Sequence, residues 1–147
     1  MFNNILVSID GSDSGQRALD AGIEMAQKFG AKMHLVHVVR EMQLPTNFGR
    51  LQDYEEASRA RHNLLKSAGE QMLTQAERSC ESKGIKDAKT HMGAGDPANA
   101  IVNCGTENGV DLIVMGSRGL GQVDGFLLGS VSRKVSNTAK VPCLIIK

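Results

Sequence analysis

Residues 111–119 read Asp-Leu-Ile-Val-Met-Gly-Ser-Arg-Gly, a run of apolar residues that ends in glycine. Four consecutive apolar residues between a polar position and a glycine predict a short buried strand over 111–115. The glycine-rich stretch that follows, 116–129, leads into a predicted helix over about 130–139. A buried strand that passes through a glycine-rich turn into a helix is the unit from which α/β sheets are built.

The same alternation of strand and helix continues along the whole chain. Strands joined by helical crossovers pair in parallel, so the alternation predicts an α/β domain over 1–147, an open parallel sheet with helices on both faces. Caps, glycines, prolines and apolar periodicity delimit the elements. Strands are predicted at about 5–9, 32–39, 87–92, 111–115 and 142–147, and helices at 13–29, 51–83, 97–107 and 130–139.

Two of the helices have a predicted buried face. The long second helix carries apolar or small side chains at four-residue spacing, and the last helix carries inward positions at similar spacing. The predicted inward residues are Leu64, Ala68, Met72, Ala76 and Cys80 on the long helix, and Val131, Val135 and Thr138 on the last helix. The segment 40–50 between the second strand and the long helix is predicted to be a loop without an assigned role.

The charge of the chain is nearly balanced but unevenly distributed. Lys and Arg number 17 and Asp and Glu number 16, a formal net charge of +1, and aromatic residues make up 3%. Nucleic-acid binders need a basic excess or closely spaced aromatic residues, so nucleic acid is not expected as a partner. Residues 116–147 nevertheless hold five basic residues and one acidic residue, so this part carries +4 and residues 1–115 carry −3. This positive charge either attracts one small anion or, at Arg133, Lys134 and Lys140, lies solvated on the last helix.

The cysteines and the apolar runs bear on where the protein resides. Cys80, Cys104 and Cys143 occur without a C-x-x-C pair, which is typical of reduced, small buried thiols in a cytoplasmic protein. No apolar run reaches the roughly 18 residues that a membrane span needs. The first residues show no secretory signal. We therefore expect a cytoplasmic protein that does not insert into membranes.

Two strand ends carry residues suited to a ligand site. Asp-Gly-Ser at 10–12 follows the first strand, and Gly-Ser-Arg-Gly at 116–119 follows the fourth. Ligands of open α/β sheets bind beyond the carboxyl ends of the strands, so these two turns are expected to share a site. Asp10 is either a ligand of that site or simply a turn and helix-capping residue, and we favour the ligand role. Arg118 either reaches the ligand or covers the loop.

The predicted start of the last helix adds an anion-binding feature. A helix N-terminus presents free N–H groups and the positive end of the helix dipole, which favour phosphate. Gly116, Gly119 and Gly129 let the backbone approach an anion closely. The hydroxyls of Ser130 and Ser132 add donors, or a ligand for a phosphate-bound Mg²⁺. Neither G-x-G-x-x-G nor G-x-x-x-x-G-K-[S/T] occurs here, so spacing alone leaves the anion unnamed.

No recognisable catalytic constellation accompanies this site. Asp10 or Asp124 is placed to position a water molecule, but neither has a partner group for hydrolysis. His34 and His37 are three residues apart on one strand, and therefore on opposite faces. His62 and His91 are isolated in the sequence. We assign no catalytic residue and expect binding with slow hydrolysis or none.

The glycine spacing resembles a known motif. Gly116-x2-Gly119-x9-Gly129-Ser130 is similar to the G-x2-G-x9-G-[S/T] nucleotide-binding motif of the universal stress protein family. The opening stretch Ile-Leu-Val-Ser-Ile-Asp-Gly-Ser at 5–12 and the closing stretch Val-Pro-Cys-Leu-Ile-Ile also resemble that family. The resemblance covers essentially the whole chain.

The resemblance implies a fold and a ligand. It implies a five-stranded parallel sheet in the order 3-2-1-4-5, and ATP, with Mg²⁺, between strands 1 and 4. The last strand, 141–146, is apolar and lies at the sheet edge in this order, so we expect a homodimer or higher homo-oligomer that pairs through it. The resemblance places Asp10 at the ribose or the metal, Val39 at adenine through its backbone, and Met115 near the ribose. The implied nucleotide-binding residues are Ser8, Ile9, Asp10, Val39, Met115, Gly116, Arg118, Gly119, Gly129, Ser130, Val131 and Ser132.

The resemblance also implies a role. Members of the family that keep the motif act as ATP-dependent regulatory modules, and a membrane transporter is a reasonable client. Two alternatives stay open at this point: a slow ATPase, and an interaction protein that works without a nucleotide.

Overall fold

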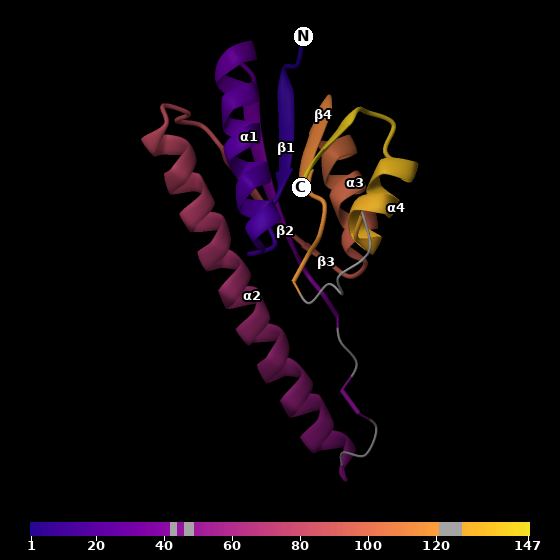
Figure 1. Cartoon of the computed structure of the whole chain (residues 1–147). Helices are drawn as coiled ribbons and strands as arrows, with labels where there is room; N and C mark the ends of the chain where they lie inside the picture. Colours follow the sequence, from indigo (N-terminus) through magenta and orange to yellow (C-terminus); the bar gives the residue numbers. More distant parts are fainter. Residues whose placement is uncertain (42–43, 46–48, 121–127) are drawn as a thin grey trace.

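The computed structural model, drawn in Figure 1, describes residues 1–41, 44–45, 49–120 and 128–147. Within these residues strands and helices alternate in the order that the sequence predicts. The candidate residue Asp124 and part of the 40–50 segment lie outside the described residues.

The central strand of the sheet is β1 (Asn4–Ser8), which pairs with β2 (Lys32–Val39) on one side and β4 (Leu112–Gly116) on the other. The edges are β3 (Lys89–Ala94) and β5 (Cys143–Ile146), so the order is β3-β2-β1-β4-β5 and all pairs are parallel. The implied order 3-2-1-4-5 is therefore confirmed. The direction of winding reverses between β1 and β4, which is where ligands bind in such sheets.

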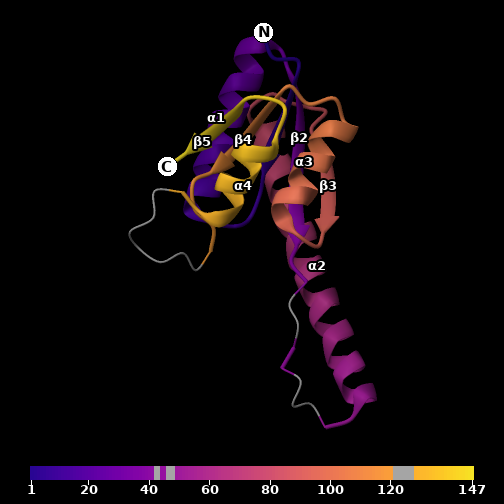
Figure 2. The same ribbon diagram turned by 90° about the vertical axis from the view of Figure 1, so that its right-hand side faces the viewer.

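Two helices cover each face of the sheet (Figure 2). On one face lie α1 (Asp13–Phe29) and α2 (Leu51–Ser82), and on the other lie α3 (Pro97–Glu107) and α4 (Ser130–Thr138). A sheet buried on both faces needs apolar strands throughout, which explains the continuous apolar runs in the sequence.

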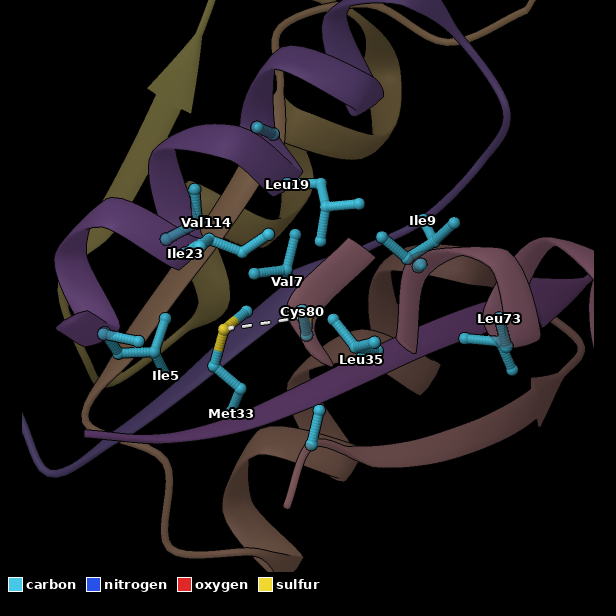
Figure 3. Close-up of a cluster of buried hydrophobic side chains, with 14 of the residues drawn as sticks. Ile5, Val7, Ile9, Leu19, Ile23, Met33, Leu35, Leu73, Cys80 and Val114 are labelled. Atoms are coloured by element: carbon cyan, nitrogen blue, oxygen red, sulfur yellow. Dashed lines mark hydrogen bonds between the residues drawn. The ribbon is translucent and has the colours of Figure 1, made fainter. Parts of the chain in front are cut away.

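The core divides into two layers because side chains alternate along each strand. Ile5 and Val7 of β1 point toward α1 and α2, into the layer drawn in Figure 3. Leu6, between them, joins the opposite layer beneath α3 and α4. In the first layer the thiol of Cys80 lies 4.0 Å from the sulfur of Met33, and burial raises the pKa of Cys80 to about 11. Cys80 is a buried thiol, as predicted, whereas Cys104 and Cys143 are only partly buried.

Local capping places the helix boundaries where the sequence predicts them. The hydroxyl of Ser12 accepts a 3.0 Å hydrogen bond from the Gly15 N–H at the start of α1, and Gly30 ends that helix with φ of 66°. Asp96 caps α3 by accepting from the Asn99 N–H at 2.9 Å. The predicted strand at 87–92 instead occupies the β3 positions, two residues later.

The predicted buried face of α2 is wrong in its first half. Leu64 is 70% exposed, and the residues of α2 that are buried begin only at Gly69. A helix of 32 residues is roughly 48 Å long, whereas strands of five to eight residues span roughly 17–26 Å. The first half of α2 therefore extends beyond the carboxyl edge of the sheet and past the ends of the five strands that the structure describes (Figure 1).

The predicted inward face of α4 also needs a correction. Thr138 is exposed, and its hydroxyl donates to the Lys134 carbonyl of its own helix. The inward positions of α4 are Ser132, which is 2% exposed, and Val135, which is fully buried. The α4 helix thus turns a serine hydroxyl, rather than a threonine, toward the sheet.

Candidate functional site

One pocket lies at the carboxyl edge of the sheet, between the ends of β1 and β4. It encloses about 580 Å³ of space not filled by atoms, open solvent at its mouth included, which is within the usual size of small-molecule sites. Residues from β1, β2, β4, α3 and α4 contribute to its walls. The lining residues are Ser8, Ile9, Asp10, His37, Val38, Arg40, Pro97, Ile101, Met115, Gly116, Ser117, Arg118, Gly119, Gly129, Val131 and Ser132.

Most of the predicted site residues meet in this pocket although they come from distant parts of the sequence. All of the predicted residues except Val39 and Ser130 line it. Ser130 is exposed and lines a neighbouring cleft between the first turns of α3 and α4. The topology of the sheet, which brings the ends of β1 and β4 side by side, is what assembles the set.

Asp10 uses its two carboxylate oxygens differently. Its Oδ1 accepts hydrogen bonds from the Ser12 N–H at 2.9 Å and from the Ser12 hydroxyl at 2.6 Å. Its Oδ2 faces the glycine-rich segment, where a Cβ placed on Gly119 would lie 3.4 Å away. The turn-forming role of Asp10 is therefore present in the structure, and the second oxygen is turned toward the pocket.

The first turn of α1 holds the segment after β4 in place. The hydroxyl of Ser14 donates to the Arg118 carbonyl at 2.7 Å, and the Ser12 hydroxyl lies 3.3 Å from the same oxygen. A Cβ on Gly116 would contact Ser14 Oγ and would lie 2.8 Å from the Gly15 N. Glycine at position 116 is required by this close approach of α1 to β4, a structural reason separate from any ligand.

Ser117 closes the base of the glycine-rich segment. Its carbonyl accepts from the Gly129 N–H at 2.6 Å and from the Ser132 hydroxyl at 3.0 Å, and its N–H donates to the Ile146 carbonyl at 2.7 Å. Ser132 was expected to offer its hydroxyl to an anion. The structure instead commits this buried hydroxyl to Ser117 and, at 3.1 Å, to the Gly129 carbonyl.

The start of α4 lacks a side-chain cap. Ser12 caps α1 and Asp96 caps α3. Gly129 precedes α4, and no side chain in the described residues accepts a hydrogen bond from the N–H groups of its first turn. Uncapped N–H groups at a helix N-terminus need water or an anion as acceptor. Because Gly129 and Val131 also line the pocket, these groups lie at its wall.

Val39, which the family resemblance places at adenine, does not line the pocket, whereas Val38 does. The Ile9 N–H donates to the Val36 carbonyl at 2.8 Å, so the backbone groups of Val36 face β1. Backbone N–H and C=O groups alternate in direction along a strand, so those of Val38 also face the β1 side, where the pocket lies. The Val39 carbonyl instead accepts from the Gly95 N–H at 3.2 Å, and its side chain is 2% exposed.

Several lining residues carry no signal in the sequence. Pro97 and Ile101 belong to the first turns of α3, and Arg40 lies one residue past β2. Their approach to the pocket depends on how α3 packs over the sheet. Only an apolar face on α3 was visible in the sequence.

The basic residues of the C-terminal quarter separate into two groups. Arg118 lines the pocket, whereas Arg133 and Lys140 are exposed. Lys134 forms a 3.0 Å ion pair with Asp96. The Asn99 N–H and then the Lys134 ammonium hold the pKa of the Asp96 carboxyl below its usual value. The solvated-face alternative therefore describes Arg133 and Lys134 on α4 and Lys140 just after it.

His91 is not isolated, contrary to expectation. Its Nε2 lies 3.0 Å from Nδ1 of His34, and the ring centroids are 5.3 Å apart. This separation fits two imidazoles joined end to end by a hydrogen bond. His37 lies on the other face of β2, where its ring contacts Gly69 of α2. Among the described residues, no group of three or more histidine, cysteine or acidic side chains is placed to hold a metal ion.

Comparison with known proteins agrees with this architecture. The sequence pattern of the Universal stress protein family matches residues 1–147. The chain belongs to the universal stress protein family. The universal stress protein YxiE of Bacillus subtilis is 39% identical over 149 residues, with all of both chains covered. A universal stress protein of Methanocaldococcus jannaschii is 32% identical, with 100% of this chain and 83% of that protein covered.

Solved structures of universal stress proteins share the fold. The protein UspA from Lactobacillus plantarum superposes with a TM-score of 0.86 at 21% identity, covering 99% of this chain and 97% of that one. A universal stress protein in complex with cAMP superposes with a TM-score of 0.71 at 28% identity, with the same coverage. No helix in the described residues of this family member is long and apolar enough to cross a membrane.

Proposed function

We propose that this protein binds ATP in the pocket between β1 and β4 and acts as a nucleotide-dependent regulatory module. The observation that carries the proposal is the N-terminus of α4, which no side chain of the described residues caps and which shares one pocket with Asp10 and the Gly116 to Gly119 turn. Backbone amides without a carboxylate cap favour a phosphate chain.

The parts of the pocket divide among the parts of the nucleotide. The N–H groups of Ser130 and Val131 face the phosphates, and the glycines at 116, 119 and 129 leave room for them, while the Gly129 N–H stays bonded to the Ser117 carbonyl. Asp10 Oδ2 accepts a hydrogen bond from a ribose hydroxyl or binds Mg²⁺. The remaining proposed contacts are Ser8, Ile9 and Val38 with the adenine base, Met115 with the ribose, and Arg118 with the phosphates. Ser132 holds the start of α4 through its hydrogen bond to the Ser117 carbonyl.

Mg²⁺ fits the donors present at this site. Mg²⁺ prefers hard oxygen ligands and is usually held by one or two protein groups together with substrate phosphates. Asp10 Oδ2 at the pocket and the Ser130 hydroxyl in the neighbouring cleft are oxygens of this kind. When bound, the ion would neutralise phosphate charge, which lets a carboxylate lie close to the phosphates.

Two further observations support an adenine nucleotide as the ligand. The glycine and serine positions match the family motif, and three of these glycines line the pocket. The solved universal stress protein in complex with cAMP, at 28% identity, is a neighbour of the whole chain. Binding with slow hydrolysis or none remains our proposal, because the pocket histidine His37 uses Nδ1 on the Ile9 carbonyl and turns its other ring nitrogen toward Gly69 of α2.

The assembly proposal concerns β5. This strand lies at the edge of the sheet and pairs only with β4 in the described chain. An apolar edge strand is a template for pairing with another chain. We propose a homodimer through β5, located in the cytoplasm, whose nucleotide state is sensed by a client such as a membrane transporter.

The test of the proposed function begins with the purified protein. The protein is denatured and the released small molecules are identified by chromatography, and the refolded protein is titrated with MgATP by calorimetry. We expect ATP in the extract or saturable one-to-one binding. An empty extract together with no binding at millimolar MgATP contradicts the proposal and favours an interaction protein. Steady phosphate release that is lost in Asp10→Asn favours the slow ATPase.

A further inference from the structure

The hydrogen-bond ladder between β1 and β2 ends in an irregular way inside the pocket. In a regular parallel ladder, the bond from Ile9 N–H to the Val36 carbonyl is followed by one from the Val38 N–H to the Ile9 carbonyl. Here Nδ1 of His37 lies 2.7 Å from the Ile9 carbonyl oxygen. Because a carbonyl oxygen only accepts, Nδ1 carries the proton and donates. The side chain of His37 therefore takes the place of the Val38 N–H.

This replacement leaves the backbone of Val38 directed at the pocket. Its N–H and C=O face the side of β1, and Val38 lines the pocket. Within the described part of the chain, the Ile9 carbonyl that would have paired with this N–H is already bonded. The N–H donor and C=O acceptor of Val38 thus lie side by side, as they do on an edge strand of a sheet before another strand pairs with it.

We infer that His37 is a positioning residue for the nucleotide base, and that it acts by holding the Ile9 carbonyl so that the Val38 N–H and C=O read the base. The inference rests on the proposed binding of a nucleotide. Adenine presents an acceptor, N1, beside a donor, the N6 amino group, which complements the N–H and C=O of one residue. Hypoxanthine presents an N–H and a carbonyl at the same positions, so its polarity is reversed.

Helix α2 packs against the imidazole ring of His37 and fixes its position. A Cβ on Gly69 would contact Cδ2 of His37 and would lie 2.8 Å from its Nε2. The methyl group of Met92 would lie 3.2 Å from the same Cβ. Only glycine leaves room for the ring at this point, which is where α2 first becomes buried. The position of α2 therefore determines the position of the ring.

The experiment compares ATP with ITP in three variants. His37→Leu removes the donor, His37→Asn keeps an N–H donor near the position of Nδ1, and Gly69→Ala displaces the ring without altering a pocket residue. Calorimetry gives the dissociation constants of MgATP and MgITP, and thermal unfolding gives the stability. The control is His34→Leu, which changes a histidine on the other face of the same strand.

We expect His37→Leu and Gly69→Ala to weaken ATP binding roughly three- to tenfold, as loss of one or two hydrogen bonds implies. ITP binding should change little, so the preference for ATP over ITP falls. His37→Asn should keep the preference, and His34→Leu should lower stability without changing it. Equal losses for ATP and ITP, or loss of the preference in the His34→Leu control, would overturn the inference and leave a structural role only. Wild-type protein that binds neither nucleotide would instead overturn the proposed function, and the inference with it.

Discussion

The hydroxyl of Ser14 donates a 2.7 Å hydrogen bond to the carbonyl oxygen of Arg118, 104 residues further along the chain. Ser14 is 6% exposed and lies in the first turn of α1, whereas Arg118 follows β4. This bond, together with the 3.3 Å contact from the Ser12 hydroxyl to the same oxygen, joins the first turn of α1 to the segment after β4, and we call these two segments the floor of the pocket. Neither turn contains a sequence motif that predicts it.

Ser14→Ala should loosen the floor of the pocket. Loss of the hydroxyl leaves the partly buried Arg118 carbonyl with only the longer contact to the Ser12 hydroxyl, and we expect the free energy of unfolding to fall by about 1 kcal/mol. ATP binding should weaken as well, because the Gly116 to Gly119 turn is no longer held. Urea unfolding and calorimetry measure the two effects. Ser136→Ala, which removes an exposed hydroxyl from α4, is the matched control, and an equal effect there would contradict the prediction.

Gly129→Val should abolish ATP binding while the protein stays folded. The φ of −68° at Gly129 is available to any residue, so the backbone is not strained by the change. The branched side chain instead occupies the space before the first turn of α4, where we place the phosphates. Calorimetry with MgATP checks the loss, and circular dichroism checks the fold. Wild-type affinity in this variant would refute the placement of the phosphates.

The His34 and His91 pair should make stability depend on pH. Burial lowers the pKa of both imidazoles from 6.5, and the positive charges of Lys89 and, at His34, Lys32 lower it further, while Glu107 opposes this at His91. The unfolded chain therefore binds more protons than the folded one at mildly acid pH. The stabilisation is present above the unfolded pKa and is lost as the pH falls through the lowered pKa values.

Urea unfolding measured between about pH 7.5 and 5 tests this dependence. The free energy of unfolding should fall with pH in the wild type, and the fall should be smaller in His91→Gln, which has no titratable group at this position. His62→Gln changes an exposed histidine on α2 and should leave the dependence as it is. A His91→Gln curve parallel to that of the wild type would show that the pair does not titrate in this range.

Ile145→Pro should convert a dimer into a monomer. The Pro142 and Ile146 carbonyls bond to β4 and its extension, so alternate residues of β5 face β4 and the N–H of Ile145 faces the open edge. Proline at 145 removes an outward donor and spares the ladder inside the sheet. Light scattering at micromolar concentration measures the mass. Leu144→Pro, which removes an inward donor, should destabilise the fold instead. A monomeric wild type would rule out the proposed dimer.

The sequence predicted the elements well because their limits depend on nearby residues. Ser12 and Asp96 cap helices through amides three residues away, and Gly30 ends α1 through its own backbone conformation. Such contacts lie within one helical turn, so a few consecutive residues of the sequence are enough to predict them. The strand order came from the family resemblance, and the pairing of β1 with β2 and β4 confirms it.

The errors share one physical origin. Leu64 and Thr138 have suitable spacing for a buried face, but exposure depends on whether a strand lies beneath them. Positions 38 and 39 are both valine. Only the register of β2 against β1 decides which of the two turns its backbone N–H and C=O toward the pocket. The contact of His34 with His91 likewise depends on the pairing of β2 with β3.

By itself the sequence determined the α/β class, the element boundaries and the two polar turns at the ends of β1 and β4, because each follows from interactions within a few residues. The tertiary structure decided which side chains meet: Ser14 with Arg118, Ser132 with Ser117, and His37 with Ile9. These bonds join residues that are distant along the chain. Their existence depends on sheet register and on how far each helix extends over the sheet, and no local pattern of residues records either quantity.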